Sequence, residues 1–290
     1  EQAPERLLSG FSGMIPEMYL ENPETIPTYL YGCYTLAMTV YLLVPALTQA
    51  FGISALPAVT EAWAKKDRGE IRQRIEAVAR ITALFCFPAG LGISAVAGPI
   101  SRVLYGEDSS SPIIAGALAL LGVASLAAAM CTPFSSMLQA VGRADLPVKL
   151  LIGAMILKLM VNWALCGIPE INIYGAALGT LICYLFLAAA QFFCLRKESG
   201  VKLSAGKLFL RPLFCAVLCG LSARVCFQGL RPILPDGTAG EAVCLGISII
   251  FGAAIYLLGL LILGAVEGND IRMLPKGQKI AKTLEKWEWI

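Results

Sequence analysis

Seven long apolar stretches divide this chain, and most of its basic residues fall into every second gap between them. The stretches run approximately over residues 31–62, 77–97, 112–138, 146–167, 174–193, 208–226 and 242–266. Their lengths match the roughly 20 residues that an α-helix needs to cross about 30 Å of hydrocarbon. Membrane β-strands would be shorter and would alternate polar and apolar residues, which these stretches do not do. The predicted fold class is therefore all-α, a polytopic helical membrane protein with seven transmembrane helices.

Composition agrees with this fold class and excludes several functions. Hydrophobic residues make up 57% of the chain, whereas soluble domains are about 45–50% apolar. The basic residues are spread over separate loops, so nucleic acid is not an expected partner. The chain contains no histidine, which excludes a histidine-based proton relay or metal site.

The ten cysteines lie singly inside or at the ends of the apolar stretches, without a CxxC pair. This pattern argues against zinc, iron–sulfur and thioredoxin-like sites, and we interpret the thiols as small buried hydrophobes. The sequence also lacks a nucleophile–base pair, a P-loop and a nucleotide-binding glycine motif. We therefore expect no catalytic residues, no metal and no cofactor, and we do not expect an enzyme.

The charged residues predict which side of the membrane each loop faces, because Lys and Arg collect in short cytoplasmic loops. Basic residues are dense around positions 65–80, 143–149 and 196–211 and in the tail at 272–286. The alternate gaps instead carry the acidic residues Glu107, Asp108, Glu170, Asp236 and Glu241. This distribution places the N-terminus outside and the C-terminus in the cytoplasm.

An odd number of spans with an exported N-terminus suggests that something upstream places residues 1–30 outside. The chain begins at Glu1, without an initiating Met or a signal peptide. We therefore expect the C-terminal part of a longer transporter, with its N-terminal lobe missing from this sequence. The alternative is a complete seven-helix, receptor-like bundle, although no receptor-type motif supports it.

Four segments follow from the pattern. They are an extracellular segment at 1–30, a five-span bundle at 31–193, two additional transmembrane helices at 194–266 and a cytoplasmic amphipathic tail at 267–290. The tail places apolar side chains and Trp287 on one helical face and lysines largely on the other, as interfacial helices do; a frayed, solvated tail is the alternative. Between the first two spans we expect a helix–turn–helix along the cytoplasmic surface, broken at residues 67–69.

Lys158 is the most informative single residue, because it lies near the middle of the fourth stretch. An ammonium group at a helix centre costs about 2.5–3.5 kcal/mol on insertion scales, so such residues commonly mark a functional site. Asn162 follows one turn later on the same helical face. Together they would present a cation and an amide to an anionic or hydroxyl-rich ligand. The alternative is a structural lysine bonded to backbone carbonyls or to a carboxylate elsewhere in the bundle.

The first stretch is the most polar and contains two prolines. We predict that Tyr34, Thr48 and Gln49 line a cavity, because polar side chains on a kinked membrane helix often face a water-filled path. Hydrogen bonds between helices are the alternative role for them. Pro45 and Pro57 are the predicted hinge or kink positions, with a kink expected at Pro57 near the cytoplasmic face.

Gly175 and Gly179 form a GxxxG motif at the outer end of the fifth stretch. Small residues four positions apart allow two membrane helices to approach closely. We therefore predict a helix-packing contact at this pair and no chemistry.

Several short motifs, taken in order, resemble the flippase branch of the MATE-like superfamily. They are SALPAVTEA at 54–62, RITALFCFPAG at 80–90, GPISRVLYG at 98–106, LQAVGR at 138–143 with Pro147, ILK at 156–158 with Asn162, YGAALGT at 174–180 and LPKG at 274–277. The chain most resembles the stage V sporulation protein B group of polysaccharide-biosynthesis membrane proteins, and more distantly the MurJ/MviN lipid II flippases. Each motif is weak alone, and their common order and spacing over nearly the whole chain make the resemblance specific.

The resemblance implies the C-terminal half of a protein with two helical lobes around a central cavity. Such proteins move an undecaprenyl-linked sugar, a precursor of peptidoglycan, spore cortex or another polysaccharide, across the bacterial cytoplasmic membrane by alternating access. Partners would be this lipid-linked sugar, membrane lipids and the N-terminal lobe. The first stretch has no Arg to match the cavity arginines of the MurJ-type relatives, so Lys158 or the other lobe would supply that charge. Two alternatives are a cation-coupled drug extruder of the same fold and a non-transporting scaffold for wall synthesis.

Overall fold

The computed structural model describes residues 14–16, 19, 22–168, 171–204, 206–235 and 237–263. The regular secondary structure of this part of the chain consists of helices joined by turns and loops. Seven of its helical segments are long and apolar enough to cross a membrane. They are Ile26–Ala64, Arg68–Ala95, Ser111–Ala140, Asp145–Cys166, Ile173–Ser199, Leu208–Leu230 and Thr238–Ile262. The predicted all-α fold with seven spans is therefore confirmed. The predicted amphipathic tail at 267–290 lies outside the described residues, as does most of the segment before residue 22.

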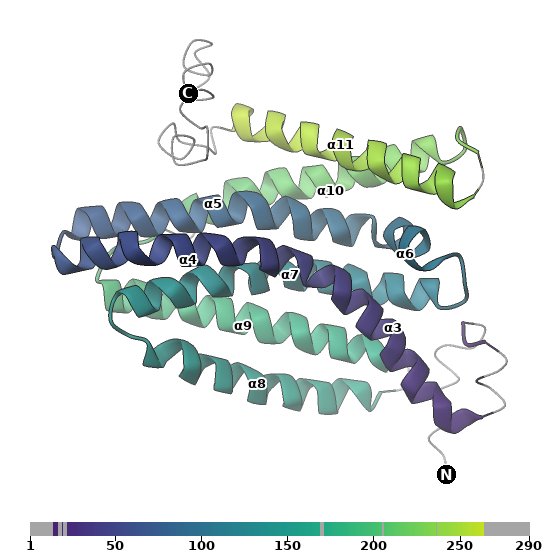
Figure 1. Ribbon diagram of the computed structural model, residues 1–290, viewed down its shortest axis with the longest axis horizontal. Helices are drawn as coiled ribbons and strands as arrows, with labels where there is room; N and C mark the ends of the chain where they lie inside the picture. Colours follow the sequence, from purple (N-terminus) through teal and green to yellow (C-terminus); the bar gives the residue numbers. More distant parts are fainter. Residues whose placement is uncertain are drawn as a thin grey trace.

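One helix forms the centre of the bundle. Helix α7 (Ser111–Ala140) packs against α3 (Ile26–Tyr41), α4 (Leu43–Ala64), α5 (Arg68–Ala95) and α9 (Ile173–Ser199) (Figure 1). Its sequence is rich in Ala and Gly, which keep the side chains short and let neighbouring backbones approach. At Gly122, for example, an added Cβ would lie only 2.7 Å from the backbone nitrogen of Ser94 in α5.

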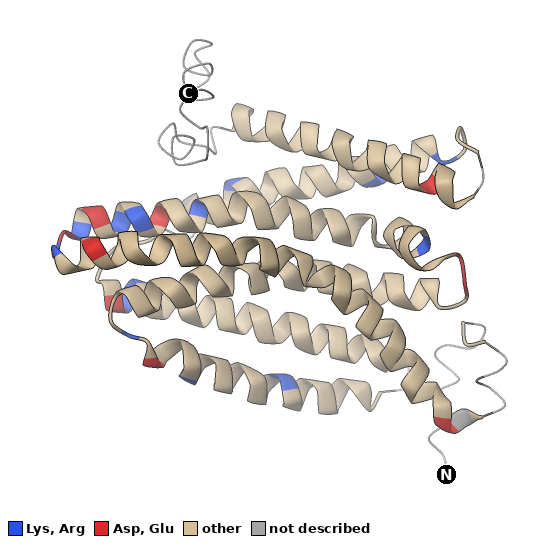
Figure 2. Ribbon diagram, viewed as in Figure 1, with Lys and Arg blue, Asp and Glu red and all other residues tan. Residues whose placement is uncertain are grey.

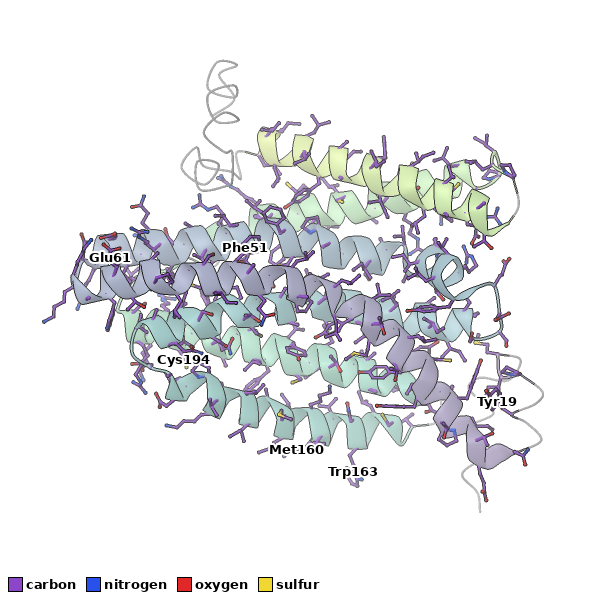
Figure 3. All side chains as sticks on the ribbon, viewed as in Figure 1. Tyr19, Phe51, Glu61, Met160, Trp163 and Cys194 are labelled. Atoms are coloured by element: carbon purple, nitrogen blue, oxygen red, sulfur yellow. The ribbon has the colours of Figure 1, made fainter. Side chains whose placement is uncertain are left out.

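Two elements lie at the edges of the bundle. Helix α8 (Asp145–Cys166) packs mainly on α9, and only 6% of its most apolar window is buried. Its outer face carries Met160 and Trp163, which point away from the other helices (Figure 3). On the opposite side, α10 (Arg211–Leu230) and α11 (Thr238–Ile262) form a hairpin. The hairpin rests on α5 and on the short helix α6 (Ala97–Tyr105), which the sequence pattern did not predict.

The first span is broken close to Pro45, one of the two predicted hinge or kink positions. Helix α3 ends at Tyr41 and α4 begins at Leu43, four and two residues before Pro45. A proline has no N–H to donate, and its ring collides with the carbonyl four residues earlier, which here belongs to Tyr41. Helix α4 continues through Pro57 without interruption, so the break lies at Pro45, the other predicted position, and a kink at Pro57 stays a prediction.

The connection between the first two long helices also differs from the expectation. The turn lies at residues 65–67, because Asp67 caps α5 by accepting hydrogen bonds from the backbone nitrogens of Gly69 (2.9 Å) and Glu70 (3.1 Å). Both helices continue their spans up to this turn and run side by side (Figure 1). They therefore do not form a separate helix–turn–helix along the membrane surface.

Charged residues gather at the two ends of the helices and are sparse between them (Figure 2). Ion pairs hold the basic end together, for example Arg74 with Glu70 at 2.8 Å and Arg143 with Glu198 at 2.6 Å. The opposite end carries a buried carboxylate, Glu241 of α11, which is 2.9 Å from Arg102 of α6 and 3.3 Å from Arg231. This network ties the α10–α11 hairpin to the rest of the bundle.

Candidate functional site

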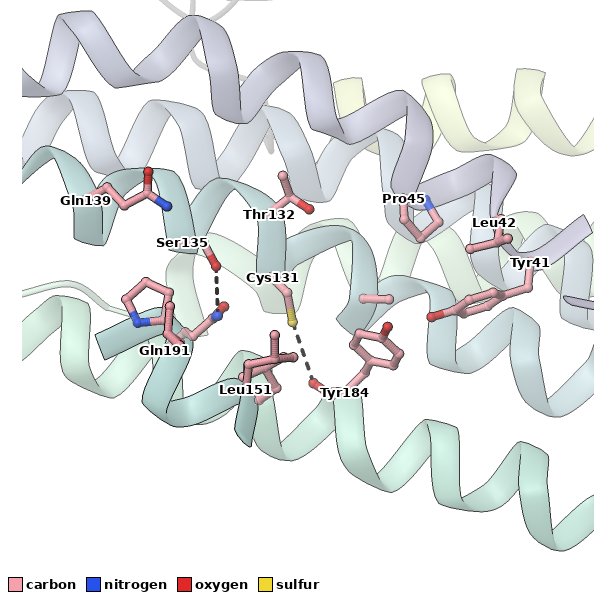
Figure 4. A pocket seen from close by; sticks show the side chains of 14 residues that line it. Tyr41, Leu42, Pro45, Cys131, Thr132, Ser135, Gln139, Leu151, Tyr184 and Gln191 are labelled. Carbon is pink, nitrogen blue, oxygen red and sulfur yellow. Dashed lines mark hydrogen bonds between the residues drawn. The ribbon is translucent and has the colours of Figure 1, made fainter. Parts of the chain in front are cut away.

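A cavity of about 340 Å³ lies between the break in the first span and helices α7, α8 and α9 (Figure 4). Its position is in the half of the bundle nearer the basic loops, because Gln139 is one residue from the end of α7 and Pro147 is the third residue of α8. The lining residues are Tyr41, Leu42, Pro45, Ala128, Cys131, Thr132, Ser135, Gln139, Pro147, Val148, Leu151, Tyr184, Leu187 and Gln191. None of them is charged.

Gln191 of α9 is the most constrained polar group of the cavity. Only 1% of the residue is exposed, and its Nε2 donates a hydrogen bond to Ser135 Oγ of α7 at 2.9 Å (Figure 4). Its Oε1 is buried and has no hydrogen-bond partner among the described residues. A buried acceptor without a partner costs about 1–3 kcal/mol. The cavity therefore contains an oxygen that a ligand or water donor would stabilise.

Two tyrosines form the end of the cavity near the break. The rings of Tyr41 and Tyr184 are 6.3 Å apart and tilted by 47°. The Tyr41 hydroxyl is buried and forms no hydrogen bond of normal geometry with a described residue. The Cys131 thiol also lines the cavity, and its Sγ lies 4.0 Å from the Tyr184 carbonyl oxygen. The site thus combines aromatic faces with uncharged donors and acceptors.

The predicted polar residues of the first span are dispersed. Tyr34 is buried and its hydroxyl is 3.1 Å from Thr180 Oγ1 of α9, outside the cavity. Thr48 is buried as well, and its Oγ1 donates to the Ala129 carbonyl at 3.0 Å. Gln49 is exposed and does not line the cavity. Of the residues predicted in this span, Pro45 alone is part of the cavity lining.

Lys158 and Asn162 lie on the side of α8 that continues outward from the cavity. Leu151 lines the cavity, and Lys158 follows seven residues later, which is nearly two full turns and therefore the same face. Lys158 is half-buried and makes no hydrogen bond or ion pair with any described residue. The Asn162 Oδ1 atom is buried without a partner. The two residues do not line the cavity itself.

The GxxxG pair lies in the contact between α8 and α9. A Cβ at Gly175 would be 2.9 Å from the Cys166 backbone nitrogen and from the Leu165 carbonyl carbon. A Cβ at Gly179 would collide with Asn162 Oδ1. The absence of side chains at both positions therefore allows the outer halves of these helices to touch.

Charged groups surround the basic end of the site. Arg143, in the loop between α7 and α8, contacts Glu198 at 2.6 Å and Asp145 at 3.3 Å, while Lys149 contacts Asp145 at 2.8 Å. The pKa of the Arg143 guanidinium is raised by its hydrogen bond to Asp145 and by the charge of Glu198. Arg143 therefore remains charged and links α7, α8 and α9 beside the cavity.

Sequence reasoning missed the residues that form the cavity walls. Ser135, Tyr184 and Gln191 are isolated polar residues in apolar helices, and only their spatial convergence distinguishes them. The available signals were Gln139 and Gln191, two amides within membrane spans. Within the described ranges no group of three Cys, Asp or Glu residues is arranged to hold a metal ion. The chemistry of the site is that of neutral hydrogen bonding.

Comparisons with a family model and with curated proteins point to the same kind of membrane protein. The family model described as "Lipid II flippase MurJ" matches residues 29–231. A curated relative, the lipid II flippase MurJ of Bacillus subtilis (strain 168), is 25% identical over 87% of this chain and 47% of its own length. Stage V sporulation protein B of the same organism is 26% identical over 86% of this chain and 46% of its own length. The chain thus spans about half the length of these relatives.

A solved structure supports the fold. The lipid II flippase MurJ in an inward closed conformation superposes with a TM-score of 0.58 at 17% sequence identity. The match covers 81% of this chain and 47% of that chain. The fold of the matched part of the chain is therefore similar to that of this solved structure.

Proposed function

Because the chain belongs to the MurJ family of lipid II flippases, we propose that it forms part of a flippase that carries a lipid-linked oligosaccharide precursor across the cytoplasmic membrane by alternating access. The observation that carries the proposal is the family match over residues 29–231, which includes all the helices that enclose the cavity. The seven membrane-spanning helices make the chain a multi-pass membrane protein, as this function requires.

In this proposal the cavity and Lys158 recognise different parts of such a substrate. The cavity offers uncharged donors and acceptors. Lys158 lies seven residues further out on the same face of α8, which at 1.5 Å per residue is about 10 Å along the axis. An anion held outside the cavity, within about 10 Å of Lys158, is attracted by at least about 1–2 kcal/mol at an effective dielectric constant of about 20. We assign Lys158 the role of attracting the anionic linkage between lipid and sugar.

The break between α3 and α4 is the place where the first span can change its angle. Tyr41, Leu42 and Pro45 lie at the break and also line the cavity. A change of angle there alters the width of the cavity directly. In this proposal the break couples substrate binding to the opening and closing of the transport path, which the portion present in the longer relatives would complete.

The other functions considered fit the site less well. A cation-coupled drug extruder needs an acidic side chain in its cavity, and none of the residues that line this cavity is acidic. A scaffold without transport activity has no use for a cavity whose wall contains a buried, unpartnered amide oxygen. Both observations favour a flippase for a sugar-bearing lipid.

Complementation tests the proposal in cells. The complete gene product is expressed in a bacterial host whose own lipid II flippase can be depleted. We expect it to restore growth and to prevent the accumulation of the lipid-linked precursor. If the protein reaches the membrane in normal amounts and the precursor still accumulates, the proposed function is wrong.

A further inference from the structure

We propose that the cavity between α4, α7, α8 and α9 binds an uncharged, hydroxyl-rich ring, the sugar portion of the lipid-linked substrate. The inference rests on the proposed function for the origin of the ligand. It rests on the geometry of the cavity for the ligand's chemistry.

The first argument is charge. All fourteen lining residues are neutral, and the two cations beside the cavity, Arg143 and Lys149, are already paired with Glu198 and Asp145. On the cavity-facing side of α8 the next cation, Lys158, is about two helical turns from Leu151. A phosphate group in the cavity would lose its hydration without gaining an ionic partner, and burying an uncompensated charge is far more costly than burying a hydroxyl group. The cavity therefore excludes the pyrophosphate portion and accepts a neutral group.

The second argument is the unmet hydrogen-bonding capacity of the walls. Gln191 Oε1 is an acceptor that is buried and unpartnered, while its amide nitrogen is fixed by Ser135 at 2.9 Å. Because that bond orients the side chain, the free oxygen has a defined direction. A sugar hydroxyl or acetamido N–H donating to it would recover about 1–3 kcal/mol of otherwise lost hydrogen-bond energy.

The third argument is the arrangement of apolar surface. Leu151 and Leu187 contribute apolar surface to the cavity lining, and the tilted rings of Tyr41 and Tyr184 lie near the break in the first span (Figure 4). A pyranose ring presents C–H groups on its faces and hydroxyl groups around its rim. Apolar walls with a few placed polar groups are the usual composition of a small-molecule site, and about 340 Å³ falls in the usual size range.

The experiment measures binding of a soluble sugar directly. The protein is reconstituted in nanodiscs, and saturation-transfer NMR is recorded with N,N′-diacetylchitobiose, an uncharged disaccharide of N-acetylated amino sugars. Inorganic pyrophosphate at equal concentration serves as the charged competitor. We expect saturation transfer to the sugar protons that millimolar pyrophosphate does not reduce.

Two variants locate the binding. Gln191→Leu removes the free acceptor, and Leu151→Trp fills the mouth of the cavity at a residue that is 44% exposed and therefore tolerates a larger side chain. We expect each to weaken sugar binding at least tenfold. Gln228→Leu, the same change at an exposed position of α10 outside the cavity, should bind like the wild type.

Three results would overturn the inference. They are no transfer to the sugar, full competition by pyrophosphate, and unchanged binding in both cavity variants. These outcomes are independent of the proposed function, since a protein that restores precursor translocation without binding the sugar refutes only the assignment of the cavity. A protein that binds the sugar at this cavity without translocating the precursor refutes only the transport.

Discussion

At the scale of single residues, the fold depends on places where a side chain is absent and on polar groups that lack a partner. Gly175 allows α9 to contact the backbone of α8. Gln191 and Asn162 each bury an oxygen without a hydrogen-bond partner among the described residues. The first feature stabilises the bundle, whereas the second weakens it unless a ligand or water is bound. Our proposal therefore assigns ligand binding to Gln191, a residue whose unpartnered oxygen lowers stability in the absence of a ligand.

Gly175→Ala tests the packing of α8 on α9. The new Cβ would be 2.9 Å from the Cys166 nitrogen and the Leu165 carbonyl carbon, so the helices must separate. We expect a loss of about 1–3 kcal/mol of stability, measured by thermal unfolding in detergent. Gly153→Ala, where no atom lies within 4 Å of the new Cβ, should be neutral or slightly stabilising. Equal stabilities for both variants would show that the α8–α9 contact does not depend on Gly175.

Lys158→Met tests the electrostatic role of this half-buried cation. Losing an attraction of 1–2 kcal/mol should lower the precursor translocation rate about tenfold. Stability should not fall, because the change removes a charge without a described partner from the middle of a span. Lys158→Arg should keep most of the activity, and Lys149→Met, which breaks an exposed pair with Asp145, should translocate normally. A normal rate in Lys158→Met would reject the role.

At the scale of helices, the sequence predicted the existence of every long span but not their internal geometry. Apolar length is a local property, so seven spans were visible without knowledge of packing. The break lies at Leu42, near Pro45, and not at Pro57. Which of the two prolines interrupts the helix depends on how neighbouring helices pack against it, and apolar length does not reveal this packing. The same applies to the cavity, because Ser135 and Gln191 converge only after α7 and α9 pack. Sequence reasoning therefore singled out Lys158, whose role stays a prediction, and named only Pro45 among the residues that line the cavity.

Pro45→Ala tests the break in the first span. Restoring the N–H allows a hydrogen bond to the Tyr41 carbonyl and removes the ring clash, so α3 and α4 should straighten. Spin labels carried by unnatural amino acids at the exposed positions 31 and 60 report the change by pulsed EPR. A straight helix would separate the two labelled positions by about 43 Å, and the wild-type distance should be shorter. The account fails if Pro45→Ala leaves the distance unchanged or if Pro57→Ala lengthens it as much.

Glu241→Gln tests how the α10–α11 hairpin is held. The carboxylate is buried and contacts Arg102 at 2.9 Å and Arg231 at 3.3 Å, so Glu241→Gln removes the negative charge that both arginines contact in this network. We expect a loss of about 3 kcal/mol in thermal unfolding and faster proteolysis between α10 and α11. Glu61→Gln breaks an exposed pair with Lys65 and should leave the unfolding temperature nearly unchanged. Similar losses in both variants would contradict a special role for the buried carboxylate.

At the scale of the whole molecule, the distribution of charge defines two different ends. Basic loops and their ion pairs lie at one end, and the acidic loop and the Glu241 network lie at the other (Figure 2). The positive-inside rule places the basic end in the cytoplasm. The cavity lies nearer that end, so it would receive substrate from the cytoplasmic side.

Epitope insertion tests this orientation. A short epitope after Asp108 should be recognised by antibody on intact right-side-out membrane vesicles. An epitope after Lys66, in the turn between α4 and α5, should be recognised only after the vesicles are permeabilised. The reverse pattern would invert the topology and the assignment of the cavity to the cytoplasmic half.

Translocation in a defined membrane tests the central claim most directly. The complete gene product is reconstituted into liposomes that contain a fluorescent lipid-linked oligosaccharide in both leaflets, and a membrane-impermeant quencher is added outside. With the protein, quenching should proceed beyond the outer leaflet toward completion, and Lys158→Met should slow this second phase about tenfold. Quenching that stops at the outer leaflet, as in liposomes without protein, would contradict the account.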